Sequence, residues 1–500
     1  MQRPMKKSTK ITLWVVGIIL GLGVLFVTCA DVAVSRIAEK QAHEAIAKAE
    51  LPFTVDFSRI HVLLMSGTVQ VEDIRFAANG KQLKQKGIDT VDVTIPDVTV
   101  RSISYWDLLK KKQVSVNTVR IHNICATYKA KGSKMSAKVD SLTVSVHDLF
   151  YSLKDSTYGY NDSVYSLKFK HLAFVEPQGL LGIDVHDLKT KNGGEITLGK
   201  TWIGHRMGKR DLGPIVKEPV SWLNLRLKSI VISPINLLRW EQFTKGVTVP
   251  KITIDGERLE TLRDVRYKPT KPFPMPQQAI MAMQFPMKIE CVDLSMKTID
   301  VNVLITDNNC GEMQLGPLKA TVRDFSNKTG SVMKVDLAGA LGEAKVNGLF
   351  KMHMNQDCRF DLSLRGKDIQ TSHLNKLLRP LTSMELDCMI DSMRADYTGD
   401  KVKAAGTVMM AYHGLSGKVY KGDEIPFKII SQNAGALEYF VNHLIPKSNP
   451  RNDSKQPLSF NVQWERKDDQ AFGLYMVGPI IMGAVETFLP GLFQGKKVKE

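Results

Sequence analysis

The residues that could carry chemistry in this chain are few and widely spaced. The tripeptide His-Asp-Leu occurs twice, at His147–Leu149 and at His186–Leu188. A neighbouring imidazole and carboxylate can work as an acid–base pair or bind a metal ion. A motif this short also arises as a turn at the end of a strand in a repeated unit. Both interpretations stay open from the sequence.

Established catalytic motifs are absent. The chain has no HExxH, no GxSxG, no Walker loop and no GxGxxG after a strand. None of the 11 histidines has a second histidine four residues away with an acid between them. We therefore expect a protein that is not an enzyme and has no metal and no cofactor, with an exported enzyme as the weaker alternative.

The first residues of the chain indicate a membrane anchor. Arg3, Lys6, Lys7 and Lys10 precede an uncharged apolar run over residues 11–28. About 18 such residues can cross a hydrocarbon core of about 30 Å as a helix, and the basic flank should stay in the cytoplasm. A cleaved signal peptide and a lipidated Cys29 are the alternatives.

Composition limits the partners. The net charge is +17, but the lysines are spread along the chain, so we expect anionic lipid headgroups or acidic glycans rather than nucleic acid. Six cysteines show no metal-like spacing. A disulfide between Cys291 and Cys310 is an alternative to five buried thiols in the exported part. The cysteines are Cys29, Cys125, Cys291, Cys310, Cys358 and Cys388.

The pattern beyond the anchor predicts a mainly β protein. An Ala-rich helix is expected over residues 30–51 and is ended by Pro52. After it, apolar residues alternate with polar ones, and the phase slips by one near Pro96. We expect a long curved antiparallel sheet of about 30 strands that forms an elongated groove. Short helices are expected at 103–111, 234–243, 371–378, 434–444 and the C-terminal end.

Two stretches of the chain echo one another. LNLRLKSIVISPINLLR at 223–239 and LSLRGKDIQTSHLNKLLR at 362–379 both suggest a strand, a turn and a short helix. Ser233 and Ser372 are the predicted helix N-caps. Repetition of this kind suggests a sheet built by addition of similar units.

The C-terminal segment 471–500 is apolar and interrupted. Glu486 is the only charged residue between Phe472 and Phe493. Pro479 and Pro490 would interrupt a helix. A buried helix, a spanning helix and an interfacial helix are all compatible with this pattern. We favour the interfacial helix, whose membrane-interface candidates are Met476, Ile480, Ile481, Val485 and Leu489.

The N-terminal quarter of the chain resembles AsmA-like proteins of Gram-negative bacteria. The resemblance covers residues 10–125 and rests on the stretches SGTVQVEDIRF and GIDTVDVTIPDVTVRSISYWDLLKKKQVSVNTVRIHN. The matching positions of the first stretch are Gly67, Val69, Val71, Asp73, Ile74 and Phe76. Those of the second are Val91, Val93, Leu108, Leu109, Lys112, Val114, Val119, Ile121 and Asn123.

The resemblance implies a taco-shaped β-groove that is anchored in the inner membrane by one pass and lies in the periplasm. It also implies that the groove binds or conducts phospholipid and supports outer-membrane homeostasis. Partners would be phospholipids, the inner membrane and a protein of the periplasm or outer membrane, with no nucleic acid. An envelope scaffold with a closed β core is the alternative.

These expectations divide the chain into segments. They are a cytoplasmic tail 1–10, an anchor 11–29, a helical connector 30–51, an AsmA-like β-unit 52–150, a β-groove 151–470 and the C-terminal segment 471–500. Period-two alternation predicts that seven residues line one apolar side of the sheet. These lipid-groove candidates are Val69, Val71, Val91, Val93, Ile95, Val114 and Val116.

The anchor prediction can be tested by topology mapping. A reporter that is active only outside the cytoplasm, fused after residue 60, should give a signal because the basic start is retained inside. A silent fusion, or a mature protein that begins near Cys29, would contradict an uncleaved anchor.

Overall fold

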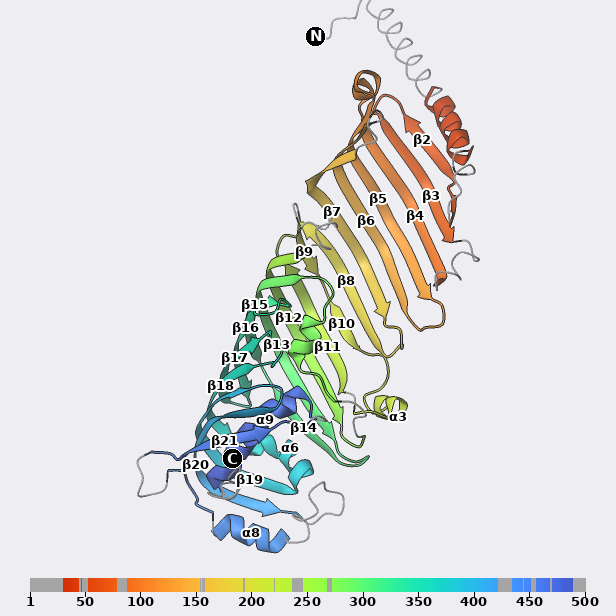
Figure 1. Ribbon diagram of the computed structural model, residues 1–500. Coiled ribbons are helices and arrows are strands. Elements are labelled where there is room, and N and C mark those ends of the chain that lie inside the picture. The colour runs from red at the N-terminus through yellow and green to blue at the C-terminus, as the bar shows by residue number, and fades with distance from the viewer. Residues whose placement is uncertain are drawn as a thin grey trace, which may run out of the picture. The chain divides into compact units, whose positions relative to one another are not determined.

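The computed structural model describes most of the chain beyond the N-terminal segment. The described residues are 30–44, 46, 53–78, 88–152, 154, 158–191, 194–219, 221–235, 246–267, 272–420, 434–443, 445–450, 456–467 and 470–488. Strands make up 61% of them. The chain divides into unit 1, Met1–Leu198 with Asn236–Leu238, and unit 2, Gly199–Ile235 with Arg239–Glu500. Figure 1 shows the elements of each unit.

Unit 1 contains an antiparallel meander. Two short strands pair with opposite halves of β3, and from β3 to β9 each strand pairs with the next. One turn of π-helix, η1 (Asp107–Lys111), precedes β5. The strands are β1 (Phe53–Asp56), β2 (Arg59–Leu63), β3 (Thr68–Ala78), β4 (Ile88–Ile103), β5 (Gln113–Ala130), β6 (Ser136–Ser152), β7 (Tyr158–Val175), β8 (Leu181–Lys191) and β9 (Glu195–Leu198).

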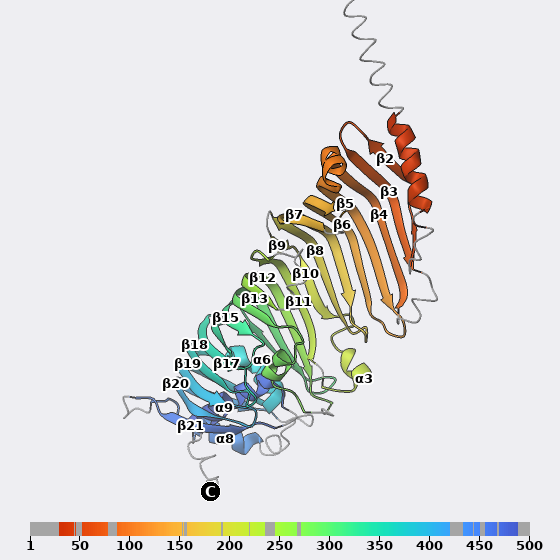
Figure 2. The same cartoon turned by 45° about the horizontal axis from the view of Figure 1, so that its top comes forward.

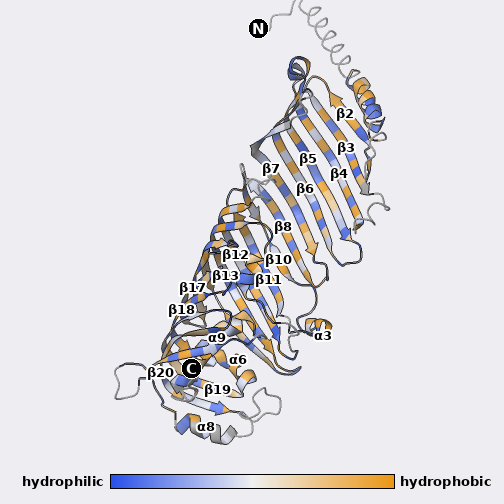
Figure 3. Cartoon of the chain, viewed as in Figure 1, coloured by the Kyte–Doolittle hydropathy of each residue, from blue (hydrophilic) through white to orange (hydrophobic). Residues whose placement is uncertain are grey.

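The strands of unit 1 form because apolar and polar residues alternate along them (Figure 3). The predicted phase slip near Pro96 involves no inserted residue, since Glu72 pairs with Asp97 and Ile74 with Ile95 in one register. Instead, Asp73 and Asn123 lie opposite Pro96 and take left-handed conformations, with φ of 55° and 54°. Asp and Asn tolerate this region better than other residues with a Cβ.

Unit 2 is a mixed sheet. Strands β12 and β13 pair in parallel, and the other paired strands described in this unit are antiparallel. Its strands are β10 (Thr201–His205), β11 (Ser221–Ile232), β12 (Val247–Asp264), β13 (Met287–Leu304), β14 (Cys310–Leu315), β15 (Leu318–Ser326), β16 (Val332–Leu341), β17 (Ala344–His353), β18 (Phe360–Gln370), β19 (Met384–Gly399), β20 (Lys403–Val419) and β21 (Ser459–Glu465).

Unit 2 also contains the described helices that follow residue 199. They are α3 (Leu212–Val216), α5 (Pro276–Met281), α6 (Ser372–Thr382), α8 (Ala434–His443) and α9 (Phe472–Phe488). Both views place α6 and α9 over the strands (Figures 1 and 2). Phe360 of β18 makes edge-on ring contacts with Phe472 and Tyr475 of α9 at centroid distances of 5.5 and 5.7 Å. A second cluster joins Tyr412 and Leu415 of β20 to Val441 of α8.

The fold class predicted from the sequence is confirmed in its coarse form, a mainly β chain with few short helices. The described strand pairings are antiparallel, as expected, except that β12 and β13 run in parallel. Among the described residues, strands β1–β21 are fewer than the number expected, because several are 16–18 residues long. The predicted helices at 371–378 and 434–444 correspond to α6 and α8, and the one at 234–243 lies mostly outside the described residues.

The predicted cap Ser372 needs correction, and the alternative of a disulfide is not borne out. The N-cap of α6 is Thr371 rather than Ser372, and no side chain caps this helix. Ser233 accepts a hydrogen bond from the Lys251 amide of the neighbouring strand β12. Cys291 and Cys310 are free thiols, as are Cys125, Cys358 and Cys388, so the suggested disulfide is not formed.

The predicted tail 1–10 and anchor 11–29 lie outside the described residues. Residues 30–44 are helical, in agreement with the predicted connector. Among the described helices, none combines the length and the apolar character that crossing a bilayer requires.

An exposed strand edge in each unit is closed by helix side chains. The helix of residues 30–44 accepts three amide hydrogen bonds from edge strand β2: Asp31 from Leu64 (2.9 Å), Ser35 from Val62 (2.8 Å) and Glu39 from Ile60 (2.9 Å). Four helical residues rise about 6.0 Å, and two strand residues about 6.8 Å. Acceptors on every fourth helical residue therefore match amides on every second strand residue.

The same spacing recurs in unit 2. On α8, Glu438 accepts from the Val419 amide and Asn442 from the Gly417 amide, both at 3.0 Å. At α6, Thr371 accepts from the Cys388 amide (2.9 Å) and Asn375 from the Leu386 amide (3.0 Å). An open edge invites pairing with another chain, so these contacts keep the edges from extending.

Removal of the acceptors on residues 30–44 should loosen strand β2. The double substitution Asp31→Ala and Glu39→Ala should lower the free energy of unfolding by about 1 kcal/mol per lost bond. Hydrogen–deuterium exchange over residues 59–64 should become faster. Lys40→Ala, an exposed change on the same helix, is the control, and equal exchange in both variants would contradict the role of the acceptors.

Candidate functional site

The seven lipid-groove candidates lie in unit 1 and belong to apolar rows that cross the strands. One row runs through Val71, Val98, Ile121, Val144 and Leu167, from β3 to β7. A parallel row contains Val69 and consists of Val69, Val100, Val119, Val146 and Tyr165. The candidates of β3 therefore face β4 residues that the site prediction did not include.

The candidates on β4 and β5 belong to other rows. Val93 lies in a row of Phe76, Val93, Ala126, Val139, Leu172 and Val185, from β3 to β8. Val91 pairs with Tyr128 and Ile95 with Ile74, while Val114 pairs with Tyr151 and Val116 with Leu149.

Whether all seven candidates lie on one side of the sheet depends on the irregular backbone of the strands beside Pro96. In a regular strand, two residues an odd number apart lie on opposite faces, as Val93 and Val98 would. The left-handed Asp73 and Asn123 lie opposite Pro96, where the apolar phase changes. The placement of all seven residues on one side stays a prediction.

The apolar rows of unit 1 are half-buried, except at Tyr165 and Val185, which are buried. All seven candidates are of intermediate exposure. Both hydrophobic clusters of the described residues lie in unit 2. The fully buried apolar residues described in unit 1 are Phe57, Ile60, Tyr165, Val185, Leu188 and Ile196. The described part of unit 1 thus presents extensive apolar surface without a packed layer above it.

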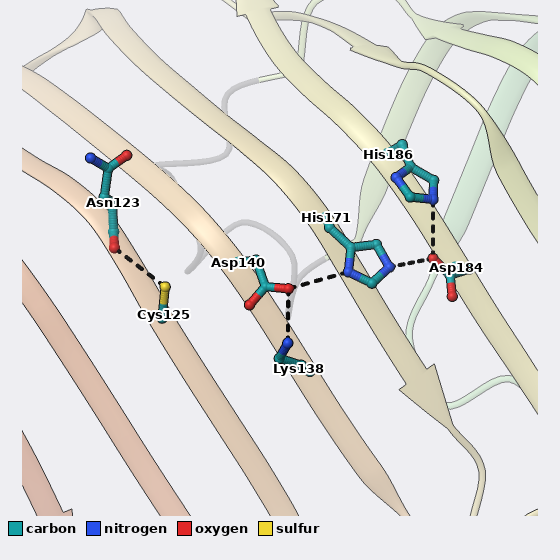
Figure 4. A network of polar contacts seen from close by, with 7 residues as sticks. All are labelled: Asn123, Cys125, Lys138, Asp140, His171, Asp184 and His186. Atoms are coloured by element: carbon teal, nitrogen blue, oxygen red, sulfur yellow. Dashed lines mark hydrogen bonds and ion pairs between the residues drawn. The ribbon is translucent and has the colours of Figure 1, made fainter.

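A polar cluster occupies β6, β7 and β8 of the same unit (Figure 4). His171 of β7 pairs across strands with Asp140 of β6 and with His186 of β8. Its Nδ1 lies 3.3 Å from Asp140 Oδ2, and its Nε2 makes a short contact with Asp184 Oδ1. His186 Nε2 lies 3.4 Å from the same Asp184 oxygen, and the two imidazole rings stack at 4.7 Å.

The charges of the cluster support one another. The hydrogen bond from Lys138 lowers the pKa of Asp140 against the effect of burial, and His171 adds to this shift. Burial lowers the pKa of His171, but hydrogen bonds and charge attraction to Asp184 and Asp140 outweigh it and raise that pKa. With a carboxylate at each ring nitrogen, a protonated His171 donates to both.

The two His-Asp-Leu tripeptides lie inside β6 and β8, so they are not turns at strand ends. Their aspartates, Asp148 and Asp187, adopt left-handed φ values of 51° and 56°. His186 joins the polar cluster, whereas His147 contacts Thr118. The sequence signal for this cluster was Asp184-Val185-His186, because alternate residues of a strand point to one face.

The membrane-interface candidates of α9 have mixed surroundings. Met476 and Ile480 pack against the first core cluster of unit 2, whereas Ile481 is 49% exposed. The side chain of Val485 and all of Leu489 lie outside what is described. Glu486 and Pro479 are buried. Leu474, Val477 and Ile481 form an exposed apolar stripe at helical spacing, so contact of α9 with a membrane stays a prediction.

A shallow depression of about 490 Å³ lies on strands β17–β20 of unit 2. Two carboxylates that line it are engaged in ion pairs, Asp396 with Arg365 at 2.9 Å and Asp361 with Arg359 at 3.4 Å. Burial opposes ionisation of Asp396, but hydrogen bonds from Arg394, Ser363 and Arg365 lower its pKa. Such exposed networks are common on protein surfaces and contribute little stability.

Comparisons with protein-family models, curated proteins and solved structures give no match to this chain. Function must therefore be inferred from the apolar rows, the polar cluster and the sequence pattern.

The packing of α9 can be tested with a pair of glycine substitutions. A Cβ at buried Gly483 would collide with Val408 of β20, which is fully buried, whereas a Cβ at Gly473 meets no atom within 4 Å. Gly483→Ala should cost about 1–3 kcal/mol, and Gly473→Ala should be neutral or stabilising by up to about 1 kcal/mol. Denaturant unfolding of both variants measures this, and equal stabilities would contradict close packing of α9 on β20.

Proposed function

We propose that this chain is a membrane-anchored envelope protein that binds phospholipid along the apolar rows of unit 1. In this proposal the anchor lies in the inner membrane, the bulk of the chain is periplasmic, and the bound lipid is conducted towards the outer membrane. The AsmA-like resemblance of residues 10–125 supports this assignment.

The observation that carries the proposal is that most side chains in these rows are only partly buried. Apolar surface in water is unfavourable by about 25 cal/mol per Å², and monomeric proteins rarely leave large contiguous apolar patches open unless they bind something. The described part of unit 1 lacks a packed hydrophobic cluster. An acyl chain would supply the missing cover and gain about 0.8 kcal/mol for each buried CH₂.

The dimensions of the rows suit an acyl chain. The row from Val71 to Leu167 crosses five strands, or four spacings of about 4.8 Å, which gives about 19 Å. One leaflet of a bilayer has an apolar depth of about 15 Å, half of the roughly 30 Å core. A single row is thus long enough for one extended chain.

The remaining features of the chain agree with a lipid ligand at a membrane. The net charge of +17 favours anionic headgroups. The helix of residues 30–44 follows the proposed anchor and is fastened to β2 by Asp31, Ser35 and Glu39. This connection would hold the first strands close to the membrane surface, where lipid would enter. On α9, the stripe of Leu474, Val477 and Ile481 offers a second apolar contact.

A scaffold or protein-binding role is the second candidate, and the packed core of unit 2 favours it. There α9 lies on the sheet, and Phe360, Tyr397 and Tyr475 are almost completely buried. A closed core leaves little room for an acyl chain, so unit 2 would serve to bind a partner protein of the periplasm or outer membrane.

The proposal predicts a face-specific lipid contact. When a photo-crosslinking amino acid replaces Val93, the full-length protein should crosslink to phospholipid in cells. The same substitution at Thr94, the next residue along β4, should not, because successive side chains point to opposite faces. Mass spectrometry of the crosslinked product identifies the adduct.

A charged residue at the same position should weaken phospholipid binding. Val93→Asp should reduce the phospholipid recovered with the purified protein at least tenfold, because an apolar site does not desolvate a carboxylate readily. Thr94→Asp should leave it near the wild-type level. Crosslinks from Val93 that reach only other parts of the same chain would show that the rows are covered internally and would favour the scaffold.

A further inference from the structure

The polar cluster of unit 1 has the composition of a metal site. We propose that His171, Asp184 and His186 bind a divalent transition-metal ion such as Zn²⁺. The candidate ligand atoms of the three side chains lie within 4.8 Å of one another. This inference does not depend on lipid binding, because it concerns other residues and another ligand.

The strand pairing brings the three ligands together. Asp184 and His186 are alternate residues of β8, so their side chains leave the same face of the sheet. His171 of β7 pairs directly with His186. Because the ligands stand on two hydrogen-bonded strands rather than on loops, their relative positions are restrained by the backbone.

The distances are close to those a bound ion needs. Zn–N and Zn–O bonds of about 2.0–2.2 Å in a tetrahedral site place the ligand atoms about 3.3 Å apart. His186 Nε2 is 3.4 Å from Asp184 Oδ1, as such a site requires. His171 Nε2 makes a shorter hydrogen-bonded contact with the same oxygen, so a bound ion would replace that hydrogen bond. The His186 side chain is 50% exposed, so its ring has room to turn toward an ion.

Asp140 contacts the second ring nitrogen of His171, a contact that a simple ion pair between His171 and Asp184 would not need. It faces Nδ1 of His171 at 3.3 Å and is itself held by Lys138 at 3.1 Å. Metal-binding histidines commonly donate their other ring N–H to a carboxylate, which fixes the ring and makes the ligating nitrogen more basic. Asp140 thus directs Nε2 of His171 toward Asp184 and His186.

The ligand types select the class of ion. Two imidazoles and one carboxylate suit Zn²⁺, Co²⁺ or Ni²⁺, whereas Mg²⁺ and Ca²⁺ prefer sites made of oxygen. Three protein ligands leave a coordination position for water or for a group from a partner. His171 and Asp184 are partly exposed, at 28% and 37% of their side-chain surface, so an ion can enter from solvent.

The proposal is tested by metal titration of the purified full-length protein in detergent. Competition with a chromogenic chelator should reveal a Zn²⁺ site that His186→Ala and Asp184→Asn weaken strongly. Asp140→Asn should weaken it about 10- to 100-fold while all three ligands remain. Co²⁺ should give a visible absorption band that Zn²⁺ removes, and Mg²⁺ should not compete.

His413→Ala is the matched control. His413 also faces an aspartate, with Nδ1 2.9 Å from Asp391 Oδ1, but it is not part of a cluster of three such ligands among the described residues. Its loss should leave the affinity unchanged. Equal Zn²⁺ affinity in wild type and His186→Ala, or a wild-type protein without the Co²⁺ band, overturns the proposal. Circular dichroism checks that each variant is folded.

Discussion

A β-sheet with alternating side chains must bury its apolar side against another layer, a ligand or a partner. The two units of this chain meet that constraint differently. In unit 2 the strands are covered by helices, and Phe360 contacts Phe472 and Tyr475 of α9. In the described part of unit 1 most side chains of the apolar rows are only partly buried. The proposed lipid function follows from this difference, because these rows need an occupant that the described residues do not provide.

A large sheet must also satisfy the backbone amides and carbonyls of its edge strands with hydrogen bonds. Unpaired amides on an edge strand attract other strands. Here the helix of residues 30–44 and helices α6 and α8 direct acceptors at four-residue spacing to alternate amides of β2, β19 and β20. The match of helical rise to strand rise explains why Asp31, Ser35 and Glu39 stand where they do. The connector beside the proposed anchor is thus part of the sheet's edge.

Strand register also determines where polar groups gather. Asp140, His171 and His186 come from three strands and meet because each pairs directly with the next. A shift of one residue in the pairing of β7 with β8 would move His186 to the other face and separate it from His171. The same registers align the row of Val71, Val98 and Ile121. One set of backbone pairings therefore positions both the apolar rows and the polar cluster.

Many local features of this protein follow from its amino-acid sequence alone. Period-two alternation identified several strands, among them β3 to β6, and helical patterns identified the connector, α6 and α8, because these patterns depend on residues close in the chain. Other features became visible only in the folded chain: β12 and β13 are parallel, Thr371 and Asn375 bind strand amides, and α9 packs on Phe360. In the folded chain Asp140 and Asp184, 44 residues apart, also share His171. These contacts join distant segments, and their free energy depends on register and packing that no local pattern encodes.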